Sequence, residues 1–428
     1  MIGCGYVGLV AASCFAELGQ NVICIDKDQT KIDLLKKGIA PISEPYLIEL
    51  IEKNTKKNRL QFSSSFTPHI ASSDLIFIAV GTFDPDQKER TDLTAIHTVI
   101  AEIAPHLTNH QVVINKSTAP IGTSRTLHNM IKKIAPNIQC SIASNPEFLR
   151  QGQAVADFMH PDRVVIGVES EHAQKKLELL YQPLESKGVP LLITDLESAE
   201  IIKYAANAFL ATKISFINEL SMLCEALNVD IRTVSSGIGL DRRIGKDFLN
   251  PGPGYGGSCL PKDIQTLIET AEQHNVSSHI LKSVMTVNAA QQTRMIEKIN
   301  LAFAGNLSDK KIAILGLTFK SGTDDMRHSP ALVILPALIA GGAQLSAYDP
   351  QGMYAAKQIL PKEMLYREDV YDAIAETDAI VLMTEWKIFT EINLAQAKKS
   401  MRGNIFIDLR NLYQKDKMQA LGFDYYCI

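Results

Sequence analysis

The segment that most narrowly limits the fold lies at the start of the chain. It reads Gly3-Cys-Gly5-Tyr-Val-Gly8, a GxGxxG pattern, and is followed by an apolar helical segment at 9–18 and a strand pattern at 21–26. The strand ends in Asp26, 18 residues after Gly8. In this arrangement a dinucleotide binds with its pyrophosphate at the helix N-terminus, and the acid accepts hydrogen bonds from the adenosine ribose. The pattern therefore predicts a dinucleotide-binding α/β unit.

The acid at the end of this strand also predicts which dinucleotide binds. A carboxylate there repels the 2′-phosphate of NADP, so NAD is the predicted cofactor. Lys31, five residues after Asp26, slightly weakens that preference.

The strand that should precede the glycine motif is nearly missing. Only Met1 and Ile2 come before Gly3, whereas the first strand of such a unit is central in the sheet and hydrogen-bonded on both edges. We therefore expect the functional polypeptide to begin several residues upstream, with a short apolar strand.

The composition of the whole chain limits its class and partners. A length of 428 residues predicts two or three domains, and a net charge of −4 gives no basic field for nucleic acid. No apolar run is long enough to span a membrane. The seven cysteines are scattered and lack CxxC spacing, which favours a reducing cytoplasm and argues against disulfides or a metal site.

Two further strand patterns end in hydroxyl residues. The segment 73–80 leads to Gly81-Thr82, and the segment 111–116 leads to Ser117-Thr118. Ligands meet open α/β sheets at such strand ends, although Thr82 is equally well explained as a helix cap. Glu147 follows Pro146 at another strand-to-loop transition, where it is either a fixed general base or an acid at a helix start.

A long uninterrupted helix is predicted from Glu197 to about Leu227. Its length of about 45 Å would link domains and allow it to pair with a copy of itself, which predicts a homodimer. Lys203 and Asn207 are four residues apart and therefore share one face. A cation and an amide on one face could stabilise an oxyanion. The alternative is that both side chains simply lie on a solvent-exposed face of the helix.

A glycine- and proline-rich loop at 248–263 contains one cysteine. Its four glycines and three prolines leave no helical or strand periodicity, and Cys259 lies near its end, followed by Lys262 and Asp263. Such a loop either presents a reactive thiol beside charged groups or is a flexible surface loop with a small buried cysteine.

The C-terminal third repeats the α/β plan without GxGxxG. Strand patterns occur at 310–316, 344–349, 379–384 and 404–408. We expect this unit to hold a nucleotide by other means, with Lys320 and Arg410 facing anionic groups. The predicted fold class is α/β, with two doubly wound Rossmann-like domains at 1–196 and 301–428. They are joined by a central helical domain at 197–300 that carries the cysteine loop and the dimer interface.

Four motifs together resemble those of the UDP-glucose/GDP-mannose dehydrogenase family, and the resemblance covers essentially the whole chain. They lie at 116–123, 145–150, 200–207 and 256–263. The run from Arg243 to Tyr255 is most similar to that of members that oxidise UDP-glucose. The resemblance implies two NAD-dependent oxidations that convert the sugar C6 alcohol of UDP-glucose to the carboxylate of UDP-glucuronate.

The resemblance also implies roles for individual residues. Cys259 would form a thiohemiacetal and then a thioester, Lys203 and Asn207 would stabilise charge on oxygen, and Asp263 would hold Lys203 or a water. Glu147 would serve hydrolysis, and Thr118 would position a water. The implied cofactor-binding residues are Gly3, Gly5, Tyr6, Val7, Gly8, Asp26, Lys31, Thr82, Ser117, Thr118, Gln151 and Arg327. The implied substrate-binding residues are Glu147, Phe148, Leu149, Lys203, Asn207, Arg243, Phe248, Asn250, Tyr255, Gly256, Lys320 and Arg410, with Arg243 reaching in from a partner subunit as one option.

Three positions depart from the family pattern. Gln151 stands where relatives usually have glutamate, Phe83 replaces a proline, and Tyr46 replaces a glycine. None of them is the thiol, so the chemistry is expected to survive. The alternatives to UDP-glucose oxidation are oxidation of GDP-mannose and a degenerate nucleotide-sugar-binding protein without turnover.

Overall fold

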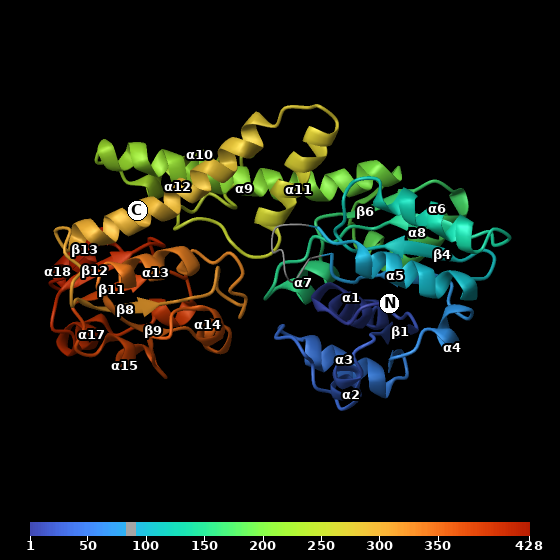
Figure 1. Ribbon diagram of the computed structural model, residues 1–428, viewed down its shortest axis with the longest axis horizontal. Coiled ribbons are helices and arrows are strands. Elements are labelled where there is room, and N and C mark those ends of the chain that lie inside the picture. Colours follow the sequence, from blue (N-terminus) through green and yellow to red (C-terminus); the bar gives the residue numbers. More distant parts are fainter. Residues whose placement is uncertain (83–90) are drawn as a thin grey trace. The chain divides into compact units, whose positions relative to one another are not determined.

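The computed structural model describes residues 1–82 and 91–428, which form two compact units, Met1–Ala206 and Asn207–Ile428. The boundary falls inside one long helix, α9 (Leu196–Ala226), which confirms the predicted helix from Glu197 (Figure 1). Each unit is built on a mainly parallel sheet, so the predicted doubly wound α/β class is confirmed. The three-part division at 1–196, 197–300 and 301–428 stays a prediction.

The strands of the first unit follow the order of a dinucleotide-binding sheet. One pair consists of β1 (Val22–Ile25) and β2 (Leu60–Ser63), and five strands follow in spatial order. These are β3 (Leu75–Ile78), β4 (Val112–Asn115), β5 (Ser141–Ser144), β6 (Val164–Val168) and β7 (Leu191–Thr194), with only the β5–β6 pairing antiparallel among the described residues.

Met1 and Ile2 lie between β1 and β3, where the first strand of this fold belongs. Ile2 forms parallel bridges to both Ile25 and Ile78. Its N–H donates to Phe77 O at 2.7 Å, and its carbonyl accepts from Ala79 N–H at 2.8 Å. On the other side, Ile25 N–H donates to Met1 O at 2.8 Å. These two residues therefore connect the pair of strands to the five-stranded sheet.

Helices cover both faces of the first sheet. One core contains apolar side chains of α1, α3, α7 and α8, and the core on the other face contains those of α5 and α6. The helix bounds are α1 (Tyr6–Glu17), α2 (Gln29–Lys36), α3 (Leu47–Lys56), α4 (Thr67–Ile70), α5 (Thr94–Ile103), α6 (Thr123–Ile134), α7 (Ala154–Met159) and α8 (Glu171–Glu185).

The second unit has six parallel strands in the same spatial order of a doubly wound sheet, β10-β9-β8-β11-β12-β13. Their bounds are β8 (Lys311–Leu315), β9 (Gln344–Tyr348), β10 (Leu365–Tyr366), β11 (Ala379–Leu382), β12 (Ile405–Asp408) and β13 (Asp424–Cys427). Helices around this sheet are α13 (Ala331–Ala340), α14 (Met353–Ile359), α15 (Val370–Ile374), α16 (Lys387–Thr390), α17 (Leu394–Ser400) and α18 (Lys415–Ala420). Every strand predicted from the sequence is present within its predicted range.

A helical layer precedes the second sheet. It contains the C-terminal part of α9 with α10 (Ile231–Gly239), α11 (Leu260–Gln273) and α12 (His279–Ala302) (Figure 1). Ala208 and Ala211 of α9 pack on Ile264 of α11 and Val284 of α12, so small residues let these helices approach closely. Among the described residues, we find no helix with the length and apolar character that a membrane crossing requires.

Tyr46, one of the departures from the family pattern, has a backbone conformation that glycine prefers. Its φ is +65°, and its side chain is 70% exposed. A side chain in the left-handed region costs on the order of 1–2 kcal/mol. We predict that Tyr46→Gly raises the melting temperature of the first unit by about 2–4 °C, measured by calorimetry. Tyr46→Ala, which keeps the Cβ atom, should not; an equal gain in both variants would contradict the argument.

Candidate active site

The glycine motif forms a tight turn that only glycine fits at two positions. A Cβ atom on Gly3, whose φ is +101°, would lie 2.4 Å from Ala79 O, and one on Gly8 would lie 2.0 Å from Gly3 O. Gly5 is different, because a Cβ there would meet nothing within 4 Å. The N-terminus of α1 carries no side-chain cap at Gly5. The turn therefore leaves open backbone N–H groups where the pyrophosphate of NAD would bind.

Asp26 is already held by three donors. Its carboxylate accepts from Cys4 N–H at 2.9 Å, from Asp28 N–H at 3.1 Å and from Lys31 Nζ at 3.1 Å. Burial opposes ionisation, but these donors outweigh it and hold the pKa of Asp26 below its usual value. The acid is therefore an anion that suits ribose hydroxyls, and Lys31 places a positive charge beside it.

Tyr6 reaches away from the glycine turn to a buried glutamate. Its hydroxyl donates to Glu44, whose carboxylate also accepts from Gly152 N–H at 2.8 Å and Ala154 N–H at 2.7 Å. Glu44 thereby ties the turn to the loop at 147–152 and to the start of α7. The sequence analysis missed Glu44, because one buried acid in a loop gives no periodic signal.

The hydroxyl residues at the strand ends bind neighbouring backbone. Thr82 Oγ1 donates to Thr118 O at 2.6 Å, and Ser117 Oγ donates to Val80 O at 2.7 Å. Thr82 therefore fixes the loop that carries Thr118, whereas the backbone N–H groups that a helix cap at Thr82 would bind lie outside the described residues. Gln151 lies in the turn before α7, and Val7 is the second residue of α1. Phe83 lies outside the described residues.

Glu147 and Lys203 form a buried ion pair in the first unit. Lys203 Nζ lies 3.2 Å from Glu147 Oε1, and both side chains are less than 10% exposed. The other carboxylate oxygen of Glu147 accepts from Leu149 N–H at 2.6 Å. Two cations lie near the Phe148 ring: Arg163 Cζ is 3.7 Å and Lys203 Nζ is 5.4 Å from the ring centroid. Lys203 is therefore not on a solvated face.

A second buried acid fixes the start of α9. Glu200 accepts from Gly122 N–H at 2.6 Å, Ser124 N–H at 2.8 Å and Ser124 Oγ at 2.7 Å, so it caps the N-terminus of α6. Burial raises the pKa of Glu200, although these donors oppose the shift. Lys203 follows one turn later on α9.

In the second unit, side chains of α9 and α12 hold the glycine-rich loop. Gly252 N–H donates to Asn218 Oδ1 at 2.9 Å, and Gly252 O accepts from Gln291 Nε2 at 2.8 Å. Tyr255 N–H donates to Asn288 Oδ1 at 2.8 Å. The backbone of this segment is therefore held by hydrogen bonds, and Cys259 is exposed, which disfavours the alternative of a flexible surface loop with a buried cysteine. The last four residues of the predicted loop, 260–263, are the first turn of α11.

Two glycines let this loop approach the second sheet. A Cβ on Gly256 would lie 2.3 Å from His328 O, and one on Gly257, with φ +80°, would lie 2.8 Å from the Phe319 ring. Gly257 N–H donates to Arg327 O at 2.8 Å. The loop that delivers Cys259 therefore lies against the 316–328 segment, which carries Lys320 and Arg327.

Cys259 is exposed at the N-terminus of α11. A helix N-terminus favours an anion. Arg327 is paired with Asp325 at 2.6 Å; that bond, chiefly, and the nearby Cys259 raise the pKa of Arg327. The buried Asp263 follows on α11; its Oδ2 accepts from Asn207 Nδ2 at 2.6 Å, and its Oδ1 lies 2.9 Å from Lys262 Nζ. The second unit thus brings a thiol, an amide, an acid and a cation together.

The other substrate-binding residues predicted in the second unit differ in exposure and in their partners. Arg410 Nε donates to Met383 O at 2.7 Å and pairs with Glu385 at 3.0 Å, and a Cβ on Gly252 would lie 3.1 Å from its guanidinium. Lys320 Nζ lies 5.8 Å from the Phe319 ring centroid. The Arg243 side chain is 89% exposed and pairs with Asp241, two residues earlier, at 2.7 Å. Phe248, with φ +63°, and the exposed Asn250 follow Arg243 in the chain by five and seven residues.

Asp349 lies directly after β9, the position that Asp26 has after β1 in the first sheet. Its Oδ2 accepts from Leu317 N–H, Thr318 N–H and Trp386 Nε1, and its Oδ1 accepts from the N–H groups of Gln351 and Gly352. The side chain is only 1% exposed. This acid is therefore used entirely inside the second unit.

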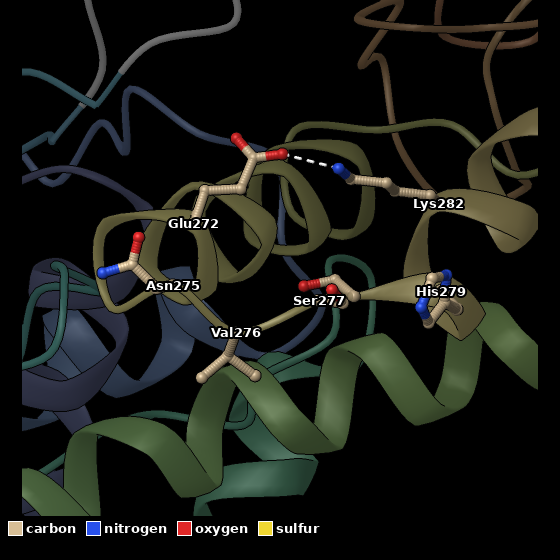
Figure 2. Close-up of a pocket in the computed structure, with 7 residues that line it drawn as sticks. Glu272, Asn275, Val276, Ser277, His279 and Lys282 are labelled. Carbon is tan, nitrogen blue, oxygen red and sulfur yellow. Dashed lines mark hydrogen bonds and ion pairs between the residues drawn. The ribbon is translucent and has the colours of Figure 1, made fainter.

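A surface hollow of about 330 Å³ lies at the other end of α11 from Cys259. Figure 2 shows Glu272 and Lys282 paired across it at 2.6 Å, with Asn275, Val276, Ser277 and His279 around the turn between α11 and α12. It contains none of the predicted catalytic residues. In the part of the chain that the structure describes, no cluster of three metal-binding side chains occurs.

An open glycine turn on one sheet and a thiol loop anchored to a second sheet define a nicotinamide-dependent dehydrogenase with two nucleotide-binding units. The family models support this class along nearly the whole chain. They match the NAD binding domain at 1–185, the central domain at 197–290 and the UDP binding domain at 313–415. The chain belongs to the UDP-glucose/GDP-mannose dehydrogenase family.

Individual relatives agree with this assignment. The chain is 44% identical to a UDP-glucose 6-dehydrogenase of Rhizobium meliloti (strain 1021), over 99% of this chain and 98% of that protein. It is 43% identical to UDP-glucose 6-dehydrogenase TuaD of Bacillus subtilis, over 100% and 92% of the two chains. A UDP-glucose dehydrogenase structure from Pyrobaculum islandicum superposes with a TM-score of 0.90 at 33% identity, covering 100% and 96%.

The two glycines Gly5 and Gly8 allow a matched test of the cofactor turn. We predict that Gly5→Ala leaves the melting temperature unchanged but weakens NAD binding about tenfold, because the methyl group enters the open space above the turn. Gly8→Ala should lower the melting temperature by several degrees, since its Cβ would overlap Gly3 O. Calorimetric titration with NAD measures the first effect, and unchanged affinity in Gly5→Ala would contradict it.

Proposed function

We propose that this chain catalyses the NAD-dependent oxidation of UDP-glucose to UDP-glucuronate, with Cys259 as nucleophile. The single observation that carries the chemistry is the exposed Cys259 thiol at the start of α11, beside the Asn207–Asp263 pair. The choice of UDP-glucose is supported by the 40–44% identity to proteins named UDP-glucose 6-dehydrogenase. These names favour UDP-glucose over GDP-mannose as the substrate.

The backbone of the glycine turn and the carboxylate of Asp26 suit NAD in the conformation that the structure shows. When bound, NAD supplies the hydride acceptor for both oxidations. Gly5 and the uncapped start of α1 would bind its pyrophosphate, and Asp26 its adenosine ribose. Thr82 and Thr118 of the first unit, and Arg327 of the second, stay predicted contacts of the cofactor.

Cys259 would hold the sugar through the second half of the reaction. After loss of a hydride and a proton from the C6 alcohol, the Cys259 sulfur bonds to C6 of the aldehyde and gives a thiohemiacetal. Loss of a second hydride and a proton gives a thioester. Water then adds to the thioester carbonyl, the C–S bond breaks, and the carboxylate leaves with Cys259 restored.

Groups in each unit have roles in these steps. Asn207, oriented by Asp263, would donate to the oxygen on C6, and Lys203 would place a positive charge on the same face of α9 one turn earlier. Glu147 would accept a proton from the attacking water, which Thr118 would help to position.

The nucleotide part of the substrate would bind in the second unit. Lys320 and Arg410 lie in the segment matched by the family's UDP binding domain, at 313–415. With Arg243, they supply cations for the pyrophosphate. Phe248, Asn250, Tyr255 and Gly256 belong to the loop that would enclose the sugar, and Phe148 and Leu149 belong to the loop of Glu147.

The proposal predicts two equivalents of NADH for each UDP-glucuronate formed, without free aldehyde, because the intermediate stays bonded to Cys259. NADH absorbance and chromatography of the product measure the ratio. We expect Cys259→Ala to lower turnover by at least about 10³-fold, whereas Cys140→Ala, a thiol outside the site, keeps it. A ratio of one, with aldehyde trapped by semicarbazide, would refute the proposal.

We also propose that the protein is a homodimer formed through α9. Phe209, Phe216 and Leu223 recur at seven-residue spacing, so they share one helix face, and each is more than 50% exposed. A row of large exposed apolar side chains on one helix is typical of an interaction surface, and a second copy offers the same row. The exposed Arg243 would then be available to the site of the partner.

The apolar row gives a direct test of assembly. Phe216→Asp should convert the dimer to a monomer, measured by sedimentation or light scattering, since a carboxylate would be buried in the interface. The control is Tyr354→Asp on α14, which changes another exposed aromatic, 81% exposed, and should keep the dimer. Equal masses for wild type and Phe216→Asp would exclude this face. A cytoplasmic location stays a prediction.

A further inference from the structure

Lys116, at the carboxyl end of β4, is a buried cation with no role in the mechanism above. Its side chain is 3% exposed, although lysine is rarely buried without a partner or a function. Its ammonium donates to Asn145 Oδ1 at 3.0 Å and to Asn145 O at 3.4 Å.

The asparagine that Lys116 binds is itself rigid. Asn145 Nδ2 donates to Val165 O at 2.9 Å, Tyr181 Oη donates to Asn145 Oδ1 at 2.5 Å, and Asn145 N–H donates to Asn115 O. Glu147 follows two residues later, across Pro146. Lys116 therefore fixes the end of β5 from which the loop with Glu147 departs.

The charges of the Glu147–Lys203 ion pair also act on Lys116. Burial lowers the pKa of Lys116 to about 8; the negative charge of Glu147 opposes the shift, and the positive charge of Lys203 adds to it. Two further ionisable groups are linked to this cluster: Tyr181, whose pKa is raised by burial, binds Asn145, and Arg163 lies 3.7 Å from the Phe148 ring centroid. Lys116, Glu147 and Lys203 thus form a buried cluster of three charges on β4, the loop after β5, and α9.

We propose that Lys116 is a positioning residue of the reaction, which orients Glu147 through Asn145 and sets the net charge of the Lys116–Glu147–Lys203 cluster. This inference rests on the proposed function. With Lys116 protonated the cluster carries a net charge of about +1, which favours negative charge on the substrate oxygen. When Lys116 loses its proton, the cluster becomes neutral and that stabilisation decreases.

Kinetics of Lys116→Met, which keeps the length of the side chain and removes the charge, test the role. We expect kcat at about pH 7 to fall roughly tenfold, with a much smaller change in KM, because the cluster acts on the transition state. The ratio of wild-type to variant kcat should shrink toward one as pH rises through about 8, since the wild-type residue becomes neutral too. Lys116→Arg, which keeps the positive charge, should restore most of kcat at about pH 7.

Lys176→Met is the matched control. Lys176 pairs with Asp74, before the amino end of β3, and its substitution should leave the pH profile unchanged. A wild-type to Lys116→Met ratio that is constant with pH would overturn the proposal, because a purely structural role does not titrate near pH 8.

A measurement without turnover separates this inference from the proposed function. The folded-state pKa of Lys116 is lowered, so between about pH 8 and 10 the unfolded chain binds up to one more proton than the folded chain. The stability of the wild type relative to Lys116→Met should therefore rise with pH in this window, measured by urea unfolding. A constant difference would overturn the titration of Lys116, whatever the substrate. Absence of NADH formation by the wild type would instead count against the proposed function alone.

Discussion

The buried carboxylate of Glu200 is the interaction on which the geometry of the first unit depends. It accepts three hydrogen bonds from the start of α6, and an unpaired donor or acceptor at such a site would cost about 1–3 kcal/mol. Because breaking these hydrogen bonds is unfavourable, they hold α9 in one orientation against the start of α6, which follows β4. Lys203 follows Glu200 by one turn of the same helix, so the position that Glu200 gives to α9 also sets the position of Lys203 beside Glu147.

The second unit reaches the same precision with a loop rather than a helix. Amide side chains of Asn218, Asn288 and Gln291 bind the backbone of the glycine-rich segment, so its conformation does not depend on its own flexible residues. Gly256 and Gly257 then allow contact with Phe319 and His328 that a Cβ atom would prevent. The loop is thus rigid, although its composition is that of a flexible chain.

Much of this arrangement could be predicted from the sequence, because strands, the long helix and the glycine turn leave periodic or spacing signals. Cys259 and Lys203 could be predicted as candidate site residues for the same reason, because they lie in the glycine-rich segment and in the long helix. Glu44, Lys116 and the cap made by Glu200 were not, since each depends on hydrogen bonds between segments far apart in the chain. Tyr6 is similar: the cofactor contact implied by the resemblance stays a prediction, and nothing in the sequence indicated that its hydroxyl donates to Glu44.

The internally bonded Asp349 has a consequence for an enzyme whose two ligands are both nucleotides. NAD and a nucleotide sugar each carry a ribose and a pyrophosphate, and the two sheets of this chain share one strand order. In the first sheet the acid after the second strand is partly accessible, whereas in the second sheet backbone N–H groups and Trp386 occupy it. At this strand end, the second sheet thus presents no accessible carboxylate to the adenosine ribose of a dinucleotide.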